Sequence, residues 1–254
     1  NKLFFTKMNR SVVIFLNDNA IDVKDLFLNK NWNISKLFDR IYSICVEAEK
    51  LQWLVKTYEN KKYAKIESDN LNSLKKINGI PKVLATNISR SLSYIILSEA
   101  PGMDLFEYID KYGVLSEKKI RVIAKQLLSI ISSMHKKRII HKDIKPENII
   151  YDSETEAITL IDFEEKYTED YRSPEQISKK DLTDKCDMWS TGITLYYLYT
   201  GDVPFRNEKA ILYKTLVFPK GTSESFKDFL GCLIERNVSL RYSADEALNH
   251  FWIN

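Results

Sequence analysis

The segment "HKDIKPENII" (141–150) combines polar side chains that could do chemistry with apolar residues that favour burial. Asp143, Lys145 and Asn148 stand at D-x-K-x-x-N spacing, and a second carboxylate, Asp162, follows the apolar run "ITLI". Two carboxylates and an amide offer the oxygen ligands that Mg²⁺ prefers. With a lysine they also suit phosphoryl transfer, in which the protein positions groups and neutralises charge. The pattern therefore predicts a site for a magnesium-bound phosphate compound.

Taken singly, each of these residues would be interpreted as an ordinary solvated loop residue. Their setting argues otherwise, because β-type apolar runs adjoin the polar cluster and predict a loop that leads into a short hairpin. A loop held by strands is a suitable platform for catalytic groups.

The elements that must position this loop change character along the chain. Short β-type runs cover 11–16, 40–46, 51–58, 61–67, 82–86 and 93–98, with a helix expected near 21–28. Beyond a turn at 99–102, apolar residues recur at helical spacing after Ser116. The apolar stretch 187–201 predicts a second, heavily buried helix that ends at Gly201, and Ser243 and Glu246 form a capping box. The sequence predicts an α+β fold with a β-rich lobe (1–100) and a helical lobe (101–254).

Composition limits the function classes. The net charge of +3 does not favour nucleic acid or a membrane surface, and the longest apolar runs are too short to span a membrane. The three cysteines, Cys45, Cys186 and Cys232, lack the spacing of a zinc site or a disulfide framework. With no leader visible at Asn1, we expect an intracellular protein, cytoplasmic or nuclear.

The motifs together resemble a eukaryotic-type protein kinase of the Ser/Thr class. "HKDIKPEN" is similar to the family's H-R-D-x-K-x-x-N loop, "DFE" to D-F-G and "YRSPE" to its A-P-E element. "DMWSTG" and "LRYSADEALNHFWI" resemble its later helices, so the likeness covers roughly residues 60–254. The resemblance implies a two-lobed kinase fold, with ATP and Mg²⁺ as cofactors and a protein as substrate.

Roles follow from the resemblance residue by residue. It makes Asp143 the catalytic base, and Lys145 the residue that steadies the transferring phosphate. Asn148 and Asp162 become the metal ligands, and Thr168 bridges Asp143 and Lys145. It also implies a buried Glu175–Arg241 ion pair and makes Asp187 the support of the catalytic loop.

In the small lobe, "YAKI" resembles V-A-I-K, which makes Lys65 the expected partner of the α- and β-phosphates. The nucleotide pocket implied by the resemblance consists of Ala64 beside that lysine, Ile44 and Leu51 around the phosphate-covering loop, Leu97, Glu99 and Ala100 at the hinge, Asp104 near the ribose and Ile150 as the floor.

Three departures from the family pattern stand out. The covering loop, counted back from Lys65 to 44–51, has no glycine; the first glycine of the chain is Gly79. Too few residues follow Lys65 for the usual regulatory helix, whose glutamate has only Glu67 and Asp69 as candidates. The activation segment is very short, and Glu164 replaces glycine after Asp162, which should restrict the backbone there. We expect a kinase held in one state, with weak nucleotide affinity.

The resulting hypothesis is a constitutive Ser/Thr protein kinase. Glu147 and Asp104 align with positions that read basic residues, so we expect a basic substrate. The alternative is a pseudokinase that acts as a scaffold or regulator, and a small-molecule kinase is a more distant one. Small size and biased composition also resemble viral kinases of the baculovirus protein kinase one type. We expect no direct binding of nucleic acid or membrane, and the sequence leaves a homodimer open.

Overall fold

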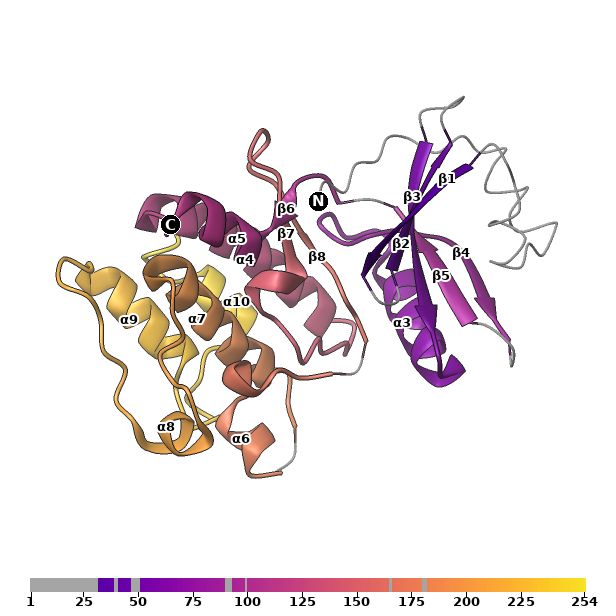
Figure 1. Ribbon diagram of the computed structural model, residues 1–254. Coiled ribbons are helices and arrows are strands. Elements are labelled where there is room, and N and C mark those ends of the chain that lie inside the picture. The colour runs from indigo at the N-terminus through magenta and orange to yellow at the C-terminus, as the bar shows by residue number, and fades with distance from the viewer. Residues whose placement is uncertain are drawn as a thin grey trace. The chain divides into compact units, whose positions relative to one another are not determined.

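The computed structural model describes residues 32–38, 41–46, 51–89, 93–98, 100–164, 166–179 and 182–254 (Figure 1). The strand expected at 11–16 and the helix expected at 21–28 lie outside these ranges. Contacts divide the chain into two compact units. The sheet unit contains the described residues up to Lys76, Ile80–Gly102 and Ile161–Glu164, and the helical unit contains Ile77–Gly79, Met103–Leu160 and the chain beyond Glu164.

The sheet unit is built on five antiparallel strands in the order β1-β2-β3-β5-β4 (Figure 1). These are β1 (Trp32–Phe38), β2 (Ile41–Val46), β3 (Leu51–Tyr58), β4 (Val83–Ile88) and β5 (Ser93–Leu97). β5 is paired on both sides, and all five of its residues are buried. The strands predicted at 40–46, 51–58, 82–86 and 93–98 are therefore confirmed.

One predicted strand is wrong, because residues 61–67 belong to helix α3 (Lys61–Leu74). Asn60 caps the helix by accepting a hydrogen bond from the Lys62 amide. The buried positions recur at helical spacing: Ala64, Glu67, Ser68, Leu71 and Leu74. This face packs against β3, β4 and β5. The prediction of a shortened or absent regulatory helix is also wrong, since α3 connects β3 to β4.

The helical unit contains seven α-helices among its described residues (Figure 1). They are α4 (Leu105–Tyr112), α5 (Glu117–His135), α6 (Pro174–Ile177), α7 (Lys185–Thr200), α8 (Glu208–Tyr213), α9 (Glu224–Leu233) and α10 (Ala244–Leu248). The predicted helices after Ser116 and over 187–201 are confirmed, as is the capping box at Ser243. α7 ends at Gly201, whose φ of 77° lies in the left-handed region that glycine adopts without strain.

The core of this unit forms around α5 and α7. The apolar face of α5 packs against α7, α10 and strand β8, and α7 also contacts α9. α7 is buried on most of its surface, as a central helix must be. The rings of Phe226 and Phe229 stack on Trp252, with centroids 4.6 and 4.7 Å away, and join α9 to the last turn of the chain.

A small antiparallel sheet carries the catalytic-loop segment. It consists of β6 (Met103–Asp104), β7 (Ile149–Tyr151) and β8 (Ile158–Leu160), and the 3-10 helix η2 (Pro146–Asn148) runs directly into β7. The predicted loop and hairpin are thus confirmed. A second 3-10 helix, η3 (Glu169–Tyr171), precedes α6.

Among the described residues, no helix has both the length and the apolar character needed to cross a bilayer. Cys186 and Cys232 are free thiols, and Cys186 is buried.

Candidate active site

The catalytic-loop residues lie in the helical unit, with Asn148 on η2 and with Asp143 and Lys145 just before it. Asp143 is 3% exposed, and its Oδ1 is buried with no hydrogen-bond partner in the described part of the chain. The Asn148 amide donates to the Asp143 carbonyl oxygen at 2.7 Å and lies 3.3 Å from its Oδ2. Because the amide nitrogen is engaged in this way, its oxygen is the atom that could serve a metal ion. A buried carboxylate with one unsatisfied oxygen suits a group that accepts a proton.

Lys145 and Thr168 complete this cluster. Lys145 Nζ donates to Thr168 Oγ1 at 2.6 Å and lies 3.4 Å from Asp143 Oδ2. Thr168 precedes η3, so the short segment after Asp162 places its hydroxyl beside the lysine. Lys145 thus contacts both Asp143 and Thr168. The bridging position expected of Thr168 and the catalytic roles of the three residues stay predictions.

Asp187, which is fully buried in the first turn of α7, supports the catalytic-loop segment by hydrogen bonds to its backbone. Its Oδ2 accepts hydrogen bonds from the His141 amide and from His135 Nε2, both at 2.9 Å. Its Oδ1 accepts the Lys142 amide at 2.8 Å. Lys142 has a φ of 73°, a strained value for a lysine, and Asp187 fixes the amide groups on this bend. The predicted support of the loop by Asp187 is confirmed.

The predicted ion pair of Glu175 and Arg241 is also confirmed. The fully buried guanidinium donates to both carboxylate oxygens, at 2.6 and 3.0 Å. It also donates to the backbone carbonyls of Glu235 and Lys185, at 2.7 and 2.8 Å. This bidentate pair fixes the "SPE" segment on the helical unit.

The phosphate-binding lysine of the sequence prediction has to be corrected. Lys65 lies on α3 with its side chain 66% exposed, paired with Asp69 at 3.0 Å, and so it does not point into the unit. The buried lysine is Lys56, on β3 and 7% exposed. Its Nζ lies 2.7 Å from Glu67 and 2.5 Å from Asp162. The lysine–glutamate pair that the sequence left in doubt is therefore formed, by Lys56 rather than Lys65.

The error came from reading "YAKI" as the V-A-I-K strand. Ala64, which was assigned to the nucleotide pocket with Lys65, is a fully buried packing residue of α3. "WLVK", which ends at Lys56 inside a correctly predicted strand, was the better match. The helical spacing of Ala64, Ser68 and Leu71 was the signal that could have corrected the assignment.

The Lys56 cluster is strongly acidic. Tyr58 donates its hydroxyl to the same Glu67 oxygen at 2.7 Å, and the 2%-exposed carboxylate of Glu164 lies 3.7 Å from Lys56 Nζ. Burial alone would lower the pKa of Lys56, but the charges of Glu67 and Asp162 outweigh it and raise that pKa. Burial, together with Glu67, raises the pKa of Tyr58. Lys56 is therefore charged and Tyr58 neutral at pH 7.

The position expected for the phosphate-covering loop shifts with the lysine. Ile44 and Leu51 lie in the paired strands β2 and β3. Counted back from Lys56, the covering loop is instead expected around residues 39–40, between β1 and β2. These residues are outside the described ones. That segment also has no glycine.

The remaining nucleotide-pocket residues are divided between the units. Leu97 ends β5 and is 5% exposed, Ala100 is partly exposed, and Glu99 lies outside the described residues. In the helical unit, Ile150 on β7 is 5% exposed, and Asp104 pairs with it across the ladder. The adenine assignments involve residues of both units, and they stay predictions.

A second acidic cluster lies in the helical unit around Tyr197. Glu147 Oε2 is buried and has no hydrogen-bond partner among the described residues. Burial raises the pKa of Tyr197, and the charges of Glu147, Asp110 and Asp104 add to the effect. Burial also raises the pKa of Asp104, with Glu147 among the further causes, although Asp104 Oδ1 caps α4 by accepting the Glu107 amide. A cation bound here would relieve this concentration of negative charge.

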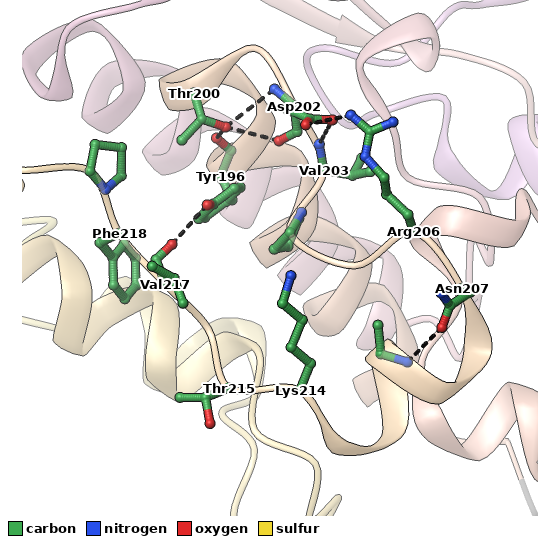
Figure 2. Close-up of a pocket in the computed structure, with 13 residues that line it drawn as sticks. Tyr196, Thr200, Asp202, Val203, Arg206, Asn207, Lys214, Thr215, Val217 and Phe218 are labelled. Carbon is green, nitrogen blue, oxygen red and sulfur yellow. Dashed lines mark hydrogen bonds and ion pairs between the residues drawn. The ribbon is translucent and has the colours of Figure 1, made fainter.

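A separate pocket of about 540 Å³ opens in the helical unit between the end of α7, α8 and residues 214–219 (Figure 2). Tyr196 donates its hydroxyl to the Val217 carbonyl at 2.8 Å, and Asp202 pairs with Arg206 at 2.6 Å. None of the predicted site residues lines this pocket.

Comparison with known proteins agrees with the geometry. Residues 38–253 match the model of the protein kinase domain family. The chain is 31% identical to myosin light chain kinase 2 of skeletal and cardiac muscle from Rattus norvegicus over 223 residues, 78% of this chain and 36% of that protein. It is 31% identical to calcium/calmodulin-dependent protein kinase type 1 of Macrobrachium nipponense over 201 residues, 69% of this chain and 58% of that protein.

The chain therefore belongs to the protein kinase family. Its fold is that of a kinase domain, with the sheet unit as the small lobe and the helical unit as the larger one. The two matches cover 36% and 58% of the relatives' own lengths, so they compare the domain and not the whole proteins.

Proposed function

We propose that the protein is a Ser/Thr protein kinase that transfers the γ-phosphate of ATP to a protein hydroxyl group. The observation that carries this proposal is the arrangement of Asp143, Lys145 and Thr168. A buried carboxylate with a free oxygen lies 3.4 Å from a lysine, and a threonine hydroxyl fixes that lysine. Asp143 accepts the proton of the substrate hydroxyl, and Lys145 stabilises charge on the transferring phosphate.

The chemistry of the donors fits ATP and Mg²⁺. Asp162 in the sheet unit and the Asn148 amide oxygen in the helical unit are each the kind of hard oxygen ligand that Mg²⁺ takes, and the family resemblance makes each a metal ligand. A bound Mg²⁺ would neutralise part of the negative charge of the phosphates. Lys56 would contact the α- and β-phosphates, with Glu67 fixing its position at 2.7 Å.

The kinase is proposed to be constitutively active. The ion pair of Lys56 and Glu67, which regulation makes and breaks in switched kinases, is already formed. Few residues separate Asp162 from Thr168, and Thr168 already contacts Lys145. No long activation loop therefore remains for a phosphate to order.

A basic protein substrate is favoured by the acidic cluster around Tyr197. The unpaired buried oxygen of Glu147 and the half-buried carboxylate of Asp104 would pair with arginine or lysine side chains of the substrate. An intracellular location and the viral type remain parts of this proposal that rest on the sequence alone.

The test is transfer of label from ATP to a basic protein in the presence of Mg²⁺. We expect wild-type protein to label the substrate, and Asp143→Asn, which keeps the shape of the side chain, to reduce the rate by about 10²–10⁴-fold. Phosphoamino-acid analysis should find phosphoserine or phosphothreonine. Equal background labelling by both proteins would refute the proposal and favour the pseudokinase alternative.

A further inference from the structure

Glu164 is the residue in which this chain departs most from the family's D-F-G motif. Its side chain is 2% exposed, and its Oε2 lies 3.7 Å from Lys56 Nζ. Oxygens of Glu67, Asp162 and Glu164 all lie within 4.8 Å of one another. The φ of Asp162 is 64°, but Glu164 is not among the residues with positive φ. The backbone at position 164 therefore does not need glycine, and the expected restriction causes no strain there.

Burying a carboxylate is costly unless a cation compensates its charge. For Glu164 the structure places the ammonium group of Lys56 within ion-pair distance. Lys56 has three N–H donors, and two of them already serve Glu67 and Asp162, at 2.7 and 2.5 Å. The third N–H group can face one more carboxylate, and Glu164 Oε2 lies 3.7 Å from the same nitrogen.

The two glutamates come from different parts of the sheet unit. Glu67 lies on helix α3, and its Oε2 is shared between Lys56 and the Tyr58 hydroxyl. Glu164 lies on the segment that also carries Asp162. A lysine held by both would stay in place if either were removed.

We propose that Glu164 is a positioning residue: a second carboxylate anchor for Lys56 that does not depend on helix α3. The proposal deepens the function given above and rests on it. It also supplies a physical reason for constitutive activity, because the orientation of Lys56 no longer depends on α3 alone.

The kinetic test is a double-mutant cycle on Glu67 and Glu164. We expect Glu67→Gln to lower kcat/KM for ATP by about 10-fold and Glu164→Gln by about 3-fold. If the anchors substitute for each other, the double variant falls by several hundred-fold, well beyond the product of about 30. KM for ATP should rise while KM for the protein substrate stays unchanged. A general loss of folding would lower the apparent kcat and leave both KM values unchanged.

Controls separate anchoring from other roles. Asp69→Asn, which removes an exposed carboxylate of the same helix, should change kcat/KM by less than about 2-fold. Glu164→Asp should recover part of the loss. Additive effects of the two glutamates would overturn the proposal. So would a changed half-saturation for Mg²⁺ in Glu164→Gln without coupling to Glu67, which would make Glu164 a metal ligand instead.

A second measurement does not depend on catalysis. Urea unfolding of wild-type protein, Lys56→Met, Glu164→Gln and the double variant gives the coupling between the two side chains. We expect a coupling factor of about 10 in the unfolding equilibrium constant. A factor below about 2 would overturn the anchor. Coupling in a protein without transferase activity would refute the proposed function but support the anchor.

Discussion

Replacing Glu175 by alanine tests the buried ion pair that fixes the "SPE" segment. Arg241 is fully buried, and the substitution removes two of the four hydrogen bonds that its guanidinium donates. Bonds to a charged partner contribute about 1.5–3 kcal/mol each, so the two together give about 3–6 kcal/mol. Breaking buried ion pairs by removing one partner costs about 3–5 kcal/mol, which agrees.

Thermal unfolding followed by circular dichroism measures this loss. For a domain of this size, about 1 kcal/mol corresponds to 2–4 °C, so a loss of about 3–5 kcal/mol should lower Tm by about 6–20 °C at pH 7. The control is Glu224→Ala, which breaks an equally short pair: Glu224 lies 2.6 Å from Lys227, and the Glu224 side chain is 90% exposed. That change should cost less than about 1 kcal/mol.

The pH dependence follows from the pKa of Glu175. Burial alone would raise this pKa, but the hydrogen bonds and charge of Arg241 lower it below its ordinary value of 4.5. A carboxyl group whose folded pKa is depressed stabilises the fold above its unfolded pKa and loses that contribution as pH falls through the folded pKa. The advantage of wild type over Glu175→Ala should therefore be full above pH 4.5 and shrink below it.

Equal Tm losses for Glu175→Ala and Glu224→Ala at pH 7 would refute the reasoning. So would a double variant, Glu175→Leu with Arg241→Met, that is less stable than Glu175→Ala alone. Once both charges are gone, apolar replacements of similar volume should recover part of the stability.

Three further predictions concern the helical unit. Thr168→Val removes the hydroxyl that Lys145 contacts at 2.6 Å and should lower kcat by about 10-fold, with recovery in Thr168→Ser, as measured by initial rates of phosphate transfer. Asp187→Asn places an N–H group against backbone donors of the catalytic loop and should lower kcat by about 10²-fold, while circular dichroism shows a folded protein. Glu147→Gln should raise KM for an arginine-containing peptide by about 10-fold and leave KM unchanged for the same peptide with alanine in place of arginine. An unchanged kcat in either of the first two variants, or the same KM change for both peptides, would contradict the assignment concerned.

The helical unit could be predicted in detail because its functional residues are close in sequence. Asp143, Lys145 and Asn148 lie within six residues of one another, and their spacing predicts phosphoryl transfer. The apolar period of α5 is long, and a long period identifies a helix reliably. α7 has no such period because it is buried on most of its surface, and its length identifies it instead. Ser116 and Gly201 fix the beginning of α5 and the end of α7 through their capping preferences.

The sheet unit was harder to predict because short apolar patterns do not distinguish a strand from a helix. "KKYAKIE" resembles a short β-type run, but its burial follows the helical spacing of Ala64, Glu67 and Leu71. That one misreading placed the expected phosphate-binding lysine at Lys65, nine positions beyond the buried Lys56, and displaced the expected covering loop with it. It also hid the helix that carries Glu67. The ion pair of Lys56 with Asp162 joins residues 106 positions apart in the sequence, and no local pattern reveals such a contact.

The most direct measurement compares two lysine substitutions in one phosphate-transfer assay. Lys56→Met removes the buried ammonium group beside Glu67 and Asp162, and Lys65→Met removes an exposed one on the same unit. We predict that Lys56→Met lowers kcat/KM for ATP by at least about 10²-fold, while Lys65→Met stays within about 2-fold of wild type. An active Lys56→Met protein, or a larger loss in Lys65→Met, would contradict the account of how this kinase holds its nucleotide.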